Sequence, residues 1–326
     1  MAKLADAEME AVLRWINHER GTSYVLRRRY AVGEEGAWLV EDAAGGTRLV
    51  LKLEADVEEL EPLLEMWPTL ERLRARGYPA PRYVDAGIHP HPPVGRFTLQ
   101  ELVPGDEAPR MDDGLVDQIV ALNDLQAGMG PPELVPQGGW RHFIIAPILE
   151  DHLGGAALKN EAMRRHSPQM AGLLECLRDY VRAQAEAPMA TGDVVHEDFH
   201  KNHIRTEIVP DPHERDRVHP GKITGIIDFE GIVTGDRVFD LVRLLSSNTG
   251  PAHRAGPQRR LWDRACEVAG AETVGVYLAS LIHRDVGYCA RWHAPVEATR
   301  RALTNAATLL GELEARTGHA LRPWRM

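Results

Sequence analysis

Residues 194–204, "VVHEDFHKNHI", contain the stretch that decides the fold. The letters "HEDFH" match H-E-x-x-H, a zinc-protease signature in which two histidines one helical turn apart bind a single ion. The same letters contain H-x-D followed by a polar run, which is the order found in loops that catalyse phosphoryl transfer. The flanking segments decide between these two chemistries.

The zinc-protease interpretation requires His196 and His200 on one face of a helix. The preceding letters "TGDVV" (191–195) predict a strand, because two β-branched residues follow Gly and Asp. No amphipathic helical pattern surrounds the motif, and no third ligand follows it. The sequence therefore disfavours a zinc protease, and it equally disfavours another metal cluster made of His196, His200 and His203.

The first hundred residues predict a small antiparallel sheet with one or two helices. The turns "GEEG" (33–36) and "DAAGG" (42–46) separate its strands. The predicted elements are a helix over 4–18, strands near 23–32, 37–42 and 47–53, and a helical segment over 56–76 that Pro62 and Pro68 interrupt.

After residue 108 the pattern becomes mainly helical, and two apolar runs around the opening motif predict a small hairpin. We therefore expect an α+β protein of two lobes. Residues 1–103 form a β-rich N-terminal lobe, and residues 104–326 form a mainly helical C-terminal lobe.

The bulk composition is that of an ordinary globular protein, with 326 residues and a net charge of −10. An acidic chain is a poor partner for nucleic acid and a reasonable one for cationic small molecules. Three widely spaced cysteines suggest no disulfide framework. The start of the chain lacks the apolar run of a signal peptide, and no stretch of 18 apolar residues occurs. We expect a cytoplasmic protein without nucleic-acid or membrane partners.

The parts needed for phosphoryl transfer occur in order along the chain. Such a reaction needs a carboxylate near the acceptor hydroxyl, metal ligands near the phosphates and a cation on the α/β-phosphates. "HED" supplies Asp198 on a loop, and "GIIDFEG" supplies Asp228 at the end of an apolar run. Lys52 lies in the β-run "RLVLKLE", and the hairpin "VGEEGAW" offers Gly33 and Gly36 as a cover for phosphates.

The letters "VVHEDFHKNHI" and "GIIDFEGIVTGDRVFDLVRLL" together resemble the aminoglycoside phosphotransferase family, which shows H-G-D-x-x-x-x-N, then I-D-[FW], then G-D-x-x-x-D-L. The resemblance covers about residues 30–245 and implies a two-lobe, protein-kinase-like fold. It also implies transfer of the γ-phosphate of ATP (or GTP) to a small-molecule hydroxyl with Mg²⁺. The implied roles are Asp198 as catalytic base, Asp228 as Mg²⁺ ligand, Lys52 on the α/β-phosphates, and Gln100, Glu101 and Leu102 as the adenine hinge.

Two departures from the family pattern bear on the metal and on the loop. The family's second metal ligand is an Asn five residues after the Asp, where this chain has His203, and Asn202 lies one residue earlier. Mg²⁺ prefers oxygen ligands, so either His203 contacts metal or phosphate, or Asn202 serves instead. Glu197 stands where the family usually has Gly.

Other side chains keep open roles at this stage. Glu65 is the expected partner of Lys52, and Glu61 is the alternative. Asp236 and Asp240 are expected to cap a helix and brace the catalytic loop. The acidic residues Glu230, Asp285 and Glu297 are candidates to meet a cationic substrate, and the aromatic residues Trp262, Tyr277, Tyr288 and Trp292 are expected in the core.

The sequence thus predicts an ATP-dependent small-molecule kinase. Its acceptor is a small molecule with a hydroxyl group, for which a cationic antibiotic such as an aminoglycoside, a sugar and an amino alcohol are candidates. The alternative is a catalytically impaired, kinase-like regulatory protein that binds nucleotide, and His203 motivates it.

Overall fold

The structure is a computed structural model that describes residues 6–30, 36–54, 60–90, 94–210, 218–247 and 256–318. Gly33, expected to cover phosphates, lies outside these residues. The chain forms two compact units, residues 1–106 with 224–227, and residues 107–223 with 228–326. A short segment from the middle of the chain thus returns to the first unit.

The first unit contains a five-stranded antiparallel sheet with the order β1-β2-β3-β5-β4. Its strands are β1 (Tyr24–Arg29), β2 (Ala37–Asp42), β3 (Arg48–Glu54), β4 (Tyr83–Ile88) and β5 (Arg96–Glu101). Two helices accompany the sheet, α1 (Asp6–Arg20) and α2 (Leu60–Ala75). Of the predicted helix over 56–76, residues 56–59 lie outside the described residues, and Leu60–Ala75 is helical with Pro68 inside it.

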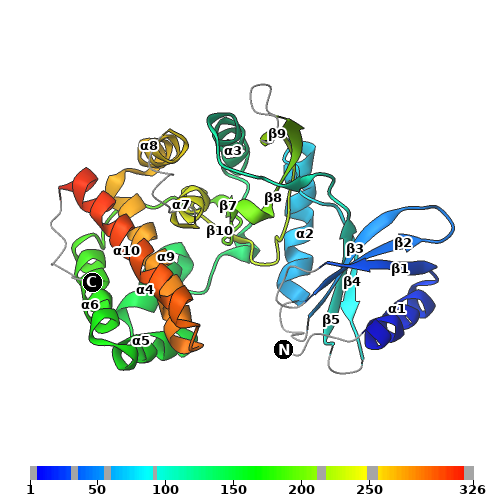
Figure 1. Ribbon diagram of the computed structural model, residues 1–326, viewed down its shortest axis with the longest axis horizontal. Coiled ribbons are helices and arrows are strands. Elements are labelled where there is room, and N and C mark those ends of the chain that lie inside the picture. The colour runs from blue at the N-terminus through cyan, green and yellow to red at the C-terminus, as the bar shows by residue number, and fades with distance from the viewer. Residues whose placement is uncertain are drawn as a thin grey trace. The chain divides into compact units, whose positions relative to one another are not determined.

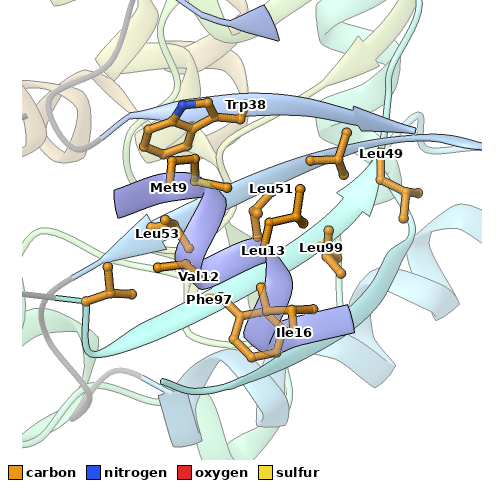
Figure 2. Packing of buried hydrophobic residues seen from close by; sticks show 12 residues of the cluster. Met9, Val12, Leu13, Ile16, Trp38, Leu49, Leu51, Leu53, Phe97 and Leu99 are labelled. Carbon is orange, nitrogen blue, oxygen red and sulfur yellow. The ribbon is translucent and has the colours of Figure 1, made fainter. Parts of the chain in front are cut away.

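One face of this sheet packs against α1, as Figure 2 shows. Alternate residues of β3, Leu49, Leu51 and Leu53, point to this face and are buried, because successive side chains of a strand point to opposite sides. They meet apolar residues of α1, β2 and β5: Met9, Val12, Leu13, Ile16, Trp38, Phe97 and Leu99.

Lys52 belongs to the other face of the sheet. It pairs with Thr98 of β5 across the strands, and the neighbouring pair on that face is Val50 with Gln100. Cross-strand partners share a face of an antiparallel pair. The core of the first unit therefore holds β3 in a fixed register that directs Lys52 away from α1.

The second unit is mainly helical. Its helices are α3 (Asp113–Leu125), α4 (Gly139–Leu149), α5 (Gly154–His166), α6 (Pro168–Ala183), α7 (Val238–Ser247), α8 (Pro257–Ala269), α9 (Ala271–Arg291) and α10 (Val296–Thr317), with short 3₁₀ turns η1 (Pro132–Leu134) and η2 (Lys201–His203). The long helix α9 contacts α4, α5, α6, α7, α8 and α10. It is therefore the central element to which the others are anchored.

Two small sheets complete the chain. One joins β7 (Asp193–Val195) to β10 (Val233–Gly235), and the other has the order β6-β8-β9, with β6 (Asp106–Glu107), β8 (Ile204–Pro210) and β9 (Val218–Ile226). The predicted α+β architecture, with a β-rich first unit and a mainly helical second unit, is confirmed. No single described helix is both long and apolar enough to cross a membrane, and α8 and α9 meet that test only as a pair bent by 117°.

Candidate active site

The opening motif lies in a loop between β7 and η2. Neither His196 nor His200 is in a helix, so they do not have the arrangement that a zinc protease requires. His196 is fully buried, and its ring centre lies 4.6 Å from that of Phe229. His196 therefore packs inside the unit. Of the loop residues that follow it, Phe199 and His203 are also buried, and the others are half-buried or exposed.

Asp240 of α7 fixes the main chain of this loop through hydrogen bonds. Its Oδ2 accepts the N–H of His196 at 2.9 Å, and its Oδ1 accepts the N–H of Glu197 at 3.0 Å. The Gln126 side chain donates to Oδ2 at 2.8 Å. Burial raises the pKa of Asp240 to about 7, although these donors act in the opposite direction. The expectation that Asp240 braces the loop agrees with these contacts.

Asp236 caps the start of α7. Its Oδ1 accepts the N–H of Val238 at 2.9 Å, and its Oδ2 accepts the Tyr277 hydroxyl at 2.9 Å. Burial raises the pKa of this carboxyl group above its usual value. Asp236 and Asp240 together tie α7 and α9 to the loop, which is why a loop can hold its side chains in place.

Two residues of the site have a left-handed backbone, Glu197 with φ 71° and Asp228 with φ 75°. This conformation is costly for residues with a Cβ atom, and such residues concentrate at functional sites. The usual glycine of the family at position 197 avoids this cost. In this chain Glu197 instead forms an ion pair with Arg284 of α9.

Two guanidinium groups and one imidazole surround Asp198. Its Oδ1 lies 2.9 Å from Nε2 of His200, 3.2 Å from Nη2 of Arg243 and 3.5 Å from Nη2 of Arg284. Burial raises the pKa of Asp198, but the hydrogen bond and charge of His200, with both guanidinium groups, outweigh it and hold the pKa far below its usual value. Asp198 is therefore ionised throughout the physiological range, and Oδ2 remains for another partner.

Arg243 connects the loop to the helices behind it. It is 6% exposed, and its Nη1 donates to both oxygens of Asp285 at 2.9 and 3.1 Å. Its Nη2 also lies 2.7 Å from Nε2 of His200. A guanidinium can only donate, so this contact requires the lone pair of His200 at Nε2 and competes with donation from His200 to Asp198. Asp285 of α9, a candidate to meet a cationic substrate, is thus paired with Arg243.

His203 and Asp228 meet beside Asp198. Nε2 of His203 lies 3.2 Å from Oδ2 of Asp228, and its Nδ1 lies 2.8 Å from the main-chain oxygen of Asp198. A carbonyl oxygen only accepts, so Nδ1 carries the proton. Burial lowers the pKa of His203, although Asp228 and Asp198 act against this. Neutral His203 therefore directs a lone pair towards a carboxylate.

Two electron-rich atoms that face each other fit a cation between them. Asp198, His203 and Asp228 each offer a ligand atom within 4.8 Å of the others, which makes them a candidate metal site within the described part of the chain. Asn202, the alternative ligand, is exposed on η2. His203 thus lies next to Asp228, and both His203 and Asn202 stay candidates for the second metal ligand. Two carboxylates also suit Mg²⁺, which prefers oxygen.

The residues expected to bind the nucleotide belong to the first unit. Lys52 is half-buried on β3, and Glu65 is exposed on α2, as is Glu61. Gly36 has φ 103°, and a Cβ atom there would lie 2.7 Å from the Trp38 ring. Glycine is thus required at position 36 by both backbone and packing.

The hinge segment spans the end of β5, which contains Gln100 and Glu101, and Leu102 just after it. Gln100 is buried, whereas Glu101 contacts Arg82 at 3.1 Å and Arg74 at 3.5 Å. A cavity of about 310 Å³ lies against Glu101 and Leu102. It is lined by these residues and by Arg74, Gly77, Tyr78, Pro79, Ala80, Pro81, Val103, Pro104 and Thr224. Lys52 is not among the residues that line it.

Sequence reasoning missed the cations around Asp198. Arg243 was detectable, because "FDLVRLL" places one cation and one carboxylate in an otherwise apolar helix, which indicates buried, paired charges. Arg284 gives no such signal in "LIHRDVG". The expectation that Tyr288 and Trp292 lie in the core is wrong, because their side chains are 47% and 60% exposed.

The sequence matches the model of a phosphotransferase enzyme family over residues 26–276. A search of the curated proteins finds no match. Among solved structures, aminoglycoside phosphotransferase APH(4)-Ia is 16% identical, covering 96% of this chain and 100% of that chain, with a TM-score of 0.69. Choline kinase LicA from Streptococcus pneumoniae is 12% identical, covering 92% and 98%, with a TM-score of 0.57. At these identities the likeness shows the fold.

Proposed function

The chain belongs to the phosphotransferase enzyme family, and from this premise we propose that it transfers the γ-phosphate of ATP (or GTP) to a hydroxyl group of a small molecule, with Mg²⁺. The family match confirms the expected enzyme class, a phosphotransferase. The observation that carries the proposal is the convergence of Asp198, His203 and Asp228 on a braced loop.

Asp198 is the catalytic residue in this proposal. The acceptor hydroxyl donates a hydrogen bond to Oδ2 of Asp198, which aligns its oxygen with the γ-phosphorus. The oxygen–phosphorus bond to the acceptor forms while the bond from γ-phosphorus to the bridging oxygen of ADP breaks. The hydroxyl proton passes to Asp198 and then to solvent. Because Asp198 has a depressed pKa, it mainly positions the hydroxyl and takes the proton late.

Asp228 and His203 would hold the Mg²⁺ ion, with the Oδ2 and Nε2 atoms that face each other. When bound, the ion neutralises charge on the phosphate oxygens. The His203 Nδ1–H remains anchored to the main-chain oxygen of Asp198, so it keeps the imidazole ring in its orientation.

The nucleotide-binding roles come from the first unit. Lys52 would contact the α/β-phosphates, Gly36 would let the chain approach them, and Glu65 would orient Lys52. The N–H groups of Glu101 and Leu102 already donate to other main-chain oxygens, at 2.8 and 3.4 Å. Along the hinge, Val103 is therefore the next N–H available to adenine.

The acceptor is the least constrained part of the proposal. A thermostable mutant of APH(4)-Ia has been crystallised in a ternary complex with ADP and hygromycin B, which supports an antibiotic as one candidate acceptor. The cationic class was inferred from the net charge of −10, a property of the whole surface. The cytoplasmic location and the absence of a nucleic-acid partner also stay predictions.

An ADP-release assay with a panel of hydroxyl compounds tests the proposal, together with nucleotide binding measured with and without Mg²⁺. We expect Mg²⁺-dependent ATP binding and acceptor-dependent ADP release. Nucleotide binding without ADP release above the rate with water would favour the alternative, a catalytically impaired regulatory protein. Failure to bind any nucleotide would contradict both.

A further inference from the structure

A row of side chains runs along α9 away from the catalytic loop. Arg284, Tyr288, Arg291 and Trp292 stand at positions i, i+4, i+7 and i+8, which places them on one side of the helix. We call them the α9 row. Its first member, Arg284, contacts Glu197 and Asp198 of the catalytic loop. The row therefore begins where the acceptor hydroxyl is expected.

Lys159 of α5 lies across this row. A Cβ atom at Gly287 would come within 3.1 to 3.4 Å of the Cβ, Cγ and Cδ atoms of Lys159. Glycine at position 287 thus lets the lysine stem rest on α9, between the levels of Arg284 and Arg291. Burial, followed by the charges of Arg284 and Arg291, lowers the pKa of Lys159, although Glu197 and Asp285 act against it.

The cations of this region differ in their partners. Arg243 is paired with Asp198 and Asp285, and Arg284 is paired with Glu197. For Lys159 and Arg291, the described part of the chain contains no carboxylate partner. Arg291 instead lies over the Trp292 ring, with 4.9 Å from its Cζ to the ring centre.

Half-buried cations without an ion-pair partner repel each other and cost free energy, which an anion bound between them would offset. The exposed rings of Tyr288 and Trp292, 47% and 60% exposed, offer apolar surface beside them. A cationic acceptor would meet two like charges here, Lys159 and Arg291, that no carboxylate of the described residues pairs.

We propose that the acceptor carries an anionic group, a carboxylate or phosphate, which Lys159 and Arg291 bind while its hydroxyl lies at Asp198. This inference rests on the proposed function and names its substrate class. Seven residues of helix separate Arg284 from Arg291, roughly 10 Å along the axis. The anionic group and the reacting hydroxyl therefore lie at opposite ends of the acceptor, as in a sugar acid or a sugar phosphate.

Lysine labelling tests the inference, because the chain has five lysines. Limiting acetic anhydride would modify each lysine at a rate measured by mass spectrometry, with Lys222 of β9 as an exposed control. Glucuronate and glucose 6-phosphate serve as anionic probes, and glucosamine serves as the cationic probe. At about ten times its Kd, an anionic probe should slow modification of Lys159 about tenfold and leave Lys222 unchanged.

The two anionic probes separate a carboxylate from a phosphate as the preferred group. Equal or better protection of Lys159 by glucosamine, or no protection by either anion, would overturn the inference. Lys52 reports the proposed function in the same experiment, because Mg²⁺ with a non-hydrolysable ATP analogue should protect it. Loss of that protection would count against nucleotide binding and leave the result at Lys159 separate.

Kinetics provide a second test with the best acceptor from the ADP-release panel. Lys159→Gln and Arg291→Gln should each raise its KM roughly tenfold or more, because hydrogen bonds to charged groups contribute about 1.5–3 kcal/mol. The KM for ATP should stay unchanged. Arg300→Gln is the matched control, since Arg300 is exposed on α10 and paired with Glu297. A best acceptor that is neutral or cationic and unaffected by both variants would contradict the inference alone.

Discussion

The catalytic loop and the α9 row are neighbours in the second unit, and they differ in whether their charged side chains form ion pairs. We call the loop and the side chains that are ion-paired with it the paired region. In the loop, every cation near Asp198 has a carboxylate partner within the protein. Along the row, Lys159 and Arg291 have none among the described residues. Paired charges fix geometry, whereas unmatched charges favour a ligand. We therefore expect loop variants to change turnover or stability, and row variants to change acceptor affinity.

The largest effect is expected at Asp198, at the centre of the paired region. Asp198→Ala should lower kcat by roughly two to four orders of magnitude, the range of general-base catalysis. The fold should survive, because Arg243 keeps Asp285 and Arg284 keeps Glu197 as partners. ADP release measures kcat, and nucleotide binding should be unchanged.

A matched control for this variant is Asp263→Ala, which removes an exposed carboxylate of α8. It should leave kcat unaltered. Wild-type turnover in Asp198→Ala would remove Asp198 from the catalytic role and would leave the paired region as a purely structural device.

Asp240 tests how the free energy of unfolding depends on the carboxyl group that accepts the N–H groups of the loop. Its pKa of about 7 exceeds the ordinary 3.8, so the folded protein binds the proton more tightly than the unfolded chain. This contribution to stability is complete below about pH 4 and is lost as the pH rises to 7, on the order of 4 kcal/mol in total.

Asp240→Asn cannot titrate, so the unfolding free energy of the wild type relative to this variant should fall between pH 4 and pH 8. Urea unfolding at both pH values measures it. Asp263→Asn, at an exposed position, should show a nearly constant difference. A gap that widens with pH would mean that the main-chain donors, and not burial, dominate at Asp240.

The sequence predicted the paired region better than the row. Asp198 and Asp228 each follow an apolar, strand-like run, and Asp240 belongs to the segment "GDRVFDL" that leads into helix α7. The two lobes followed from strand-like alternation around Lys52 and from helical patterns after residue 108.

The surface formed by Lys159 and the α9 row was not predicted because its residues come from two parts of the chain distant in sequence. Lys159 and Arg291 become neighbours only through the packing of α5 on α9, which depends on the absence of a side chain at Gly287. Tyr288 and Trp292 were expected in the core because composition alone does not say which side of a helix faces out. The net charge averages over the whole surface, so it does not report the charge near Lys159 and Arg291.

His203 stands in the paired region where the family has an oxygen ligand, and a smaller effect is expected there. His203→Asn should keep activity within a few-fold and shift the metal preference from Mn²⁺ towards Mg²⁺, because Mg²⁺ demands oxygen ligands. The ratio of kcat/KM with the two ions measures this. Asn202→Ala, at the exposed neighbour, should not change the ratio. A shift in Asn202→Ala alone would transfer the ligand role to Asn202.

The smallest effect is expected at Glu197, where the paired region and the row meet. Glu197 has φ 71°, a conformation that costs an ordinary residue about 1–2 kcal/mol and costs glycine almost nothing. Glu197→Gly and Glu197→Ala both remove the ion pair with Arg284, so their difference isolates the backbone. Glu197→Gly should be the more stable of the two by about 1 kcal/mol.

The same two substitutions at Glu161, on helix α5, should rank in the reverse order, because glycine in a helix interior is less stable than alanine by about 1 kcal/mol. Urea unfolding of the four variants tests the reversal, and an alanine at least as stable as glycine at position 197 would contradict the backbone argument.

Loss of the Glu197 carboxylate also releases Arg284 to bind an anionic acceptor together with Lys159 and Arg291. Both Glu197 variants should therefore lower the KM for an anionic acceptor, whereas the Glu161 variants should not. An unchanged KM would mean that Arg284 acts only in the catalytic loop and does not bind the acceptor with Lys159 and Arg291.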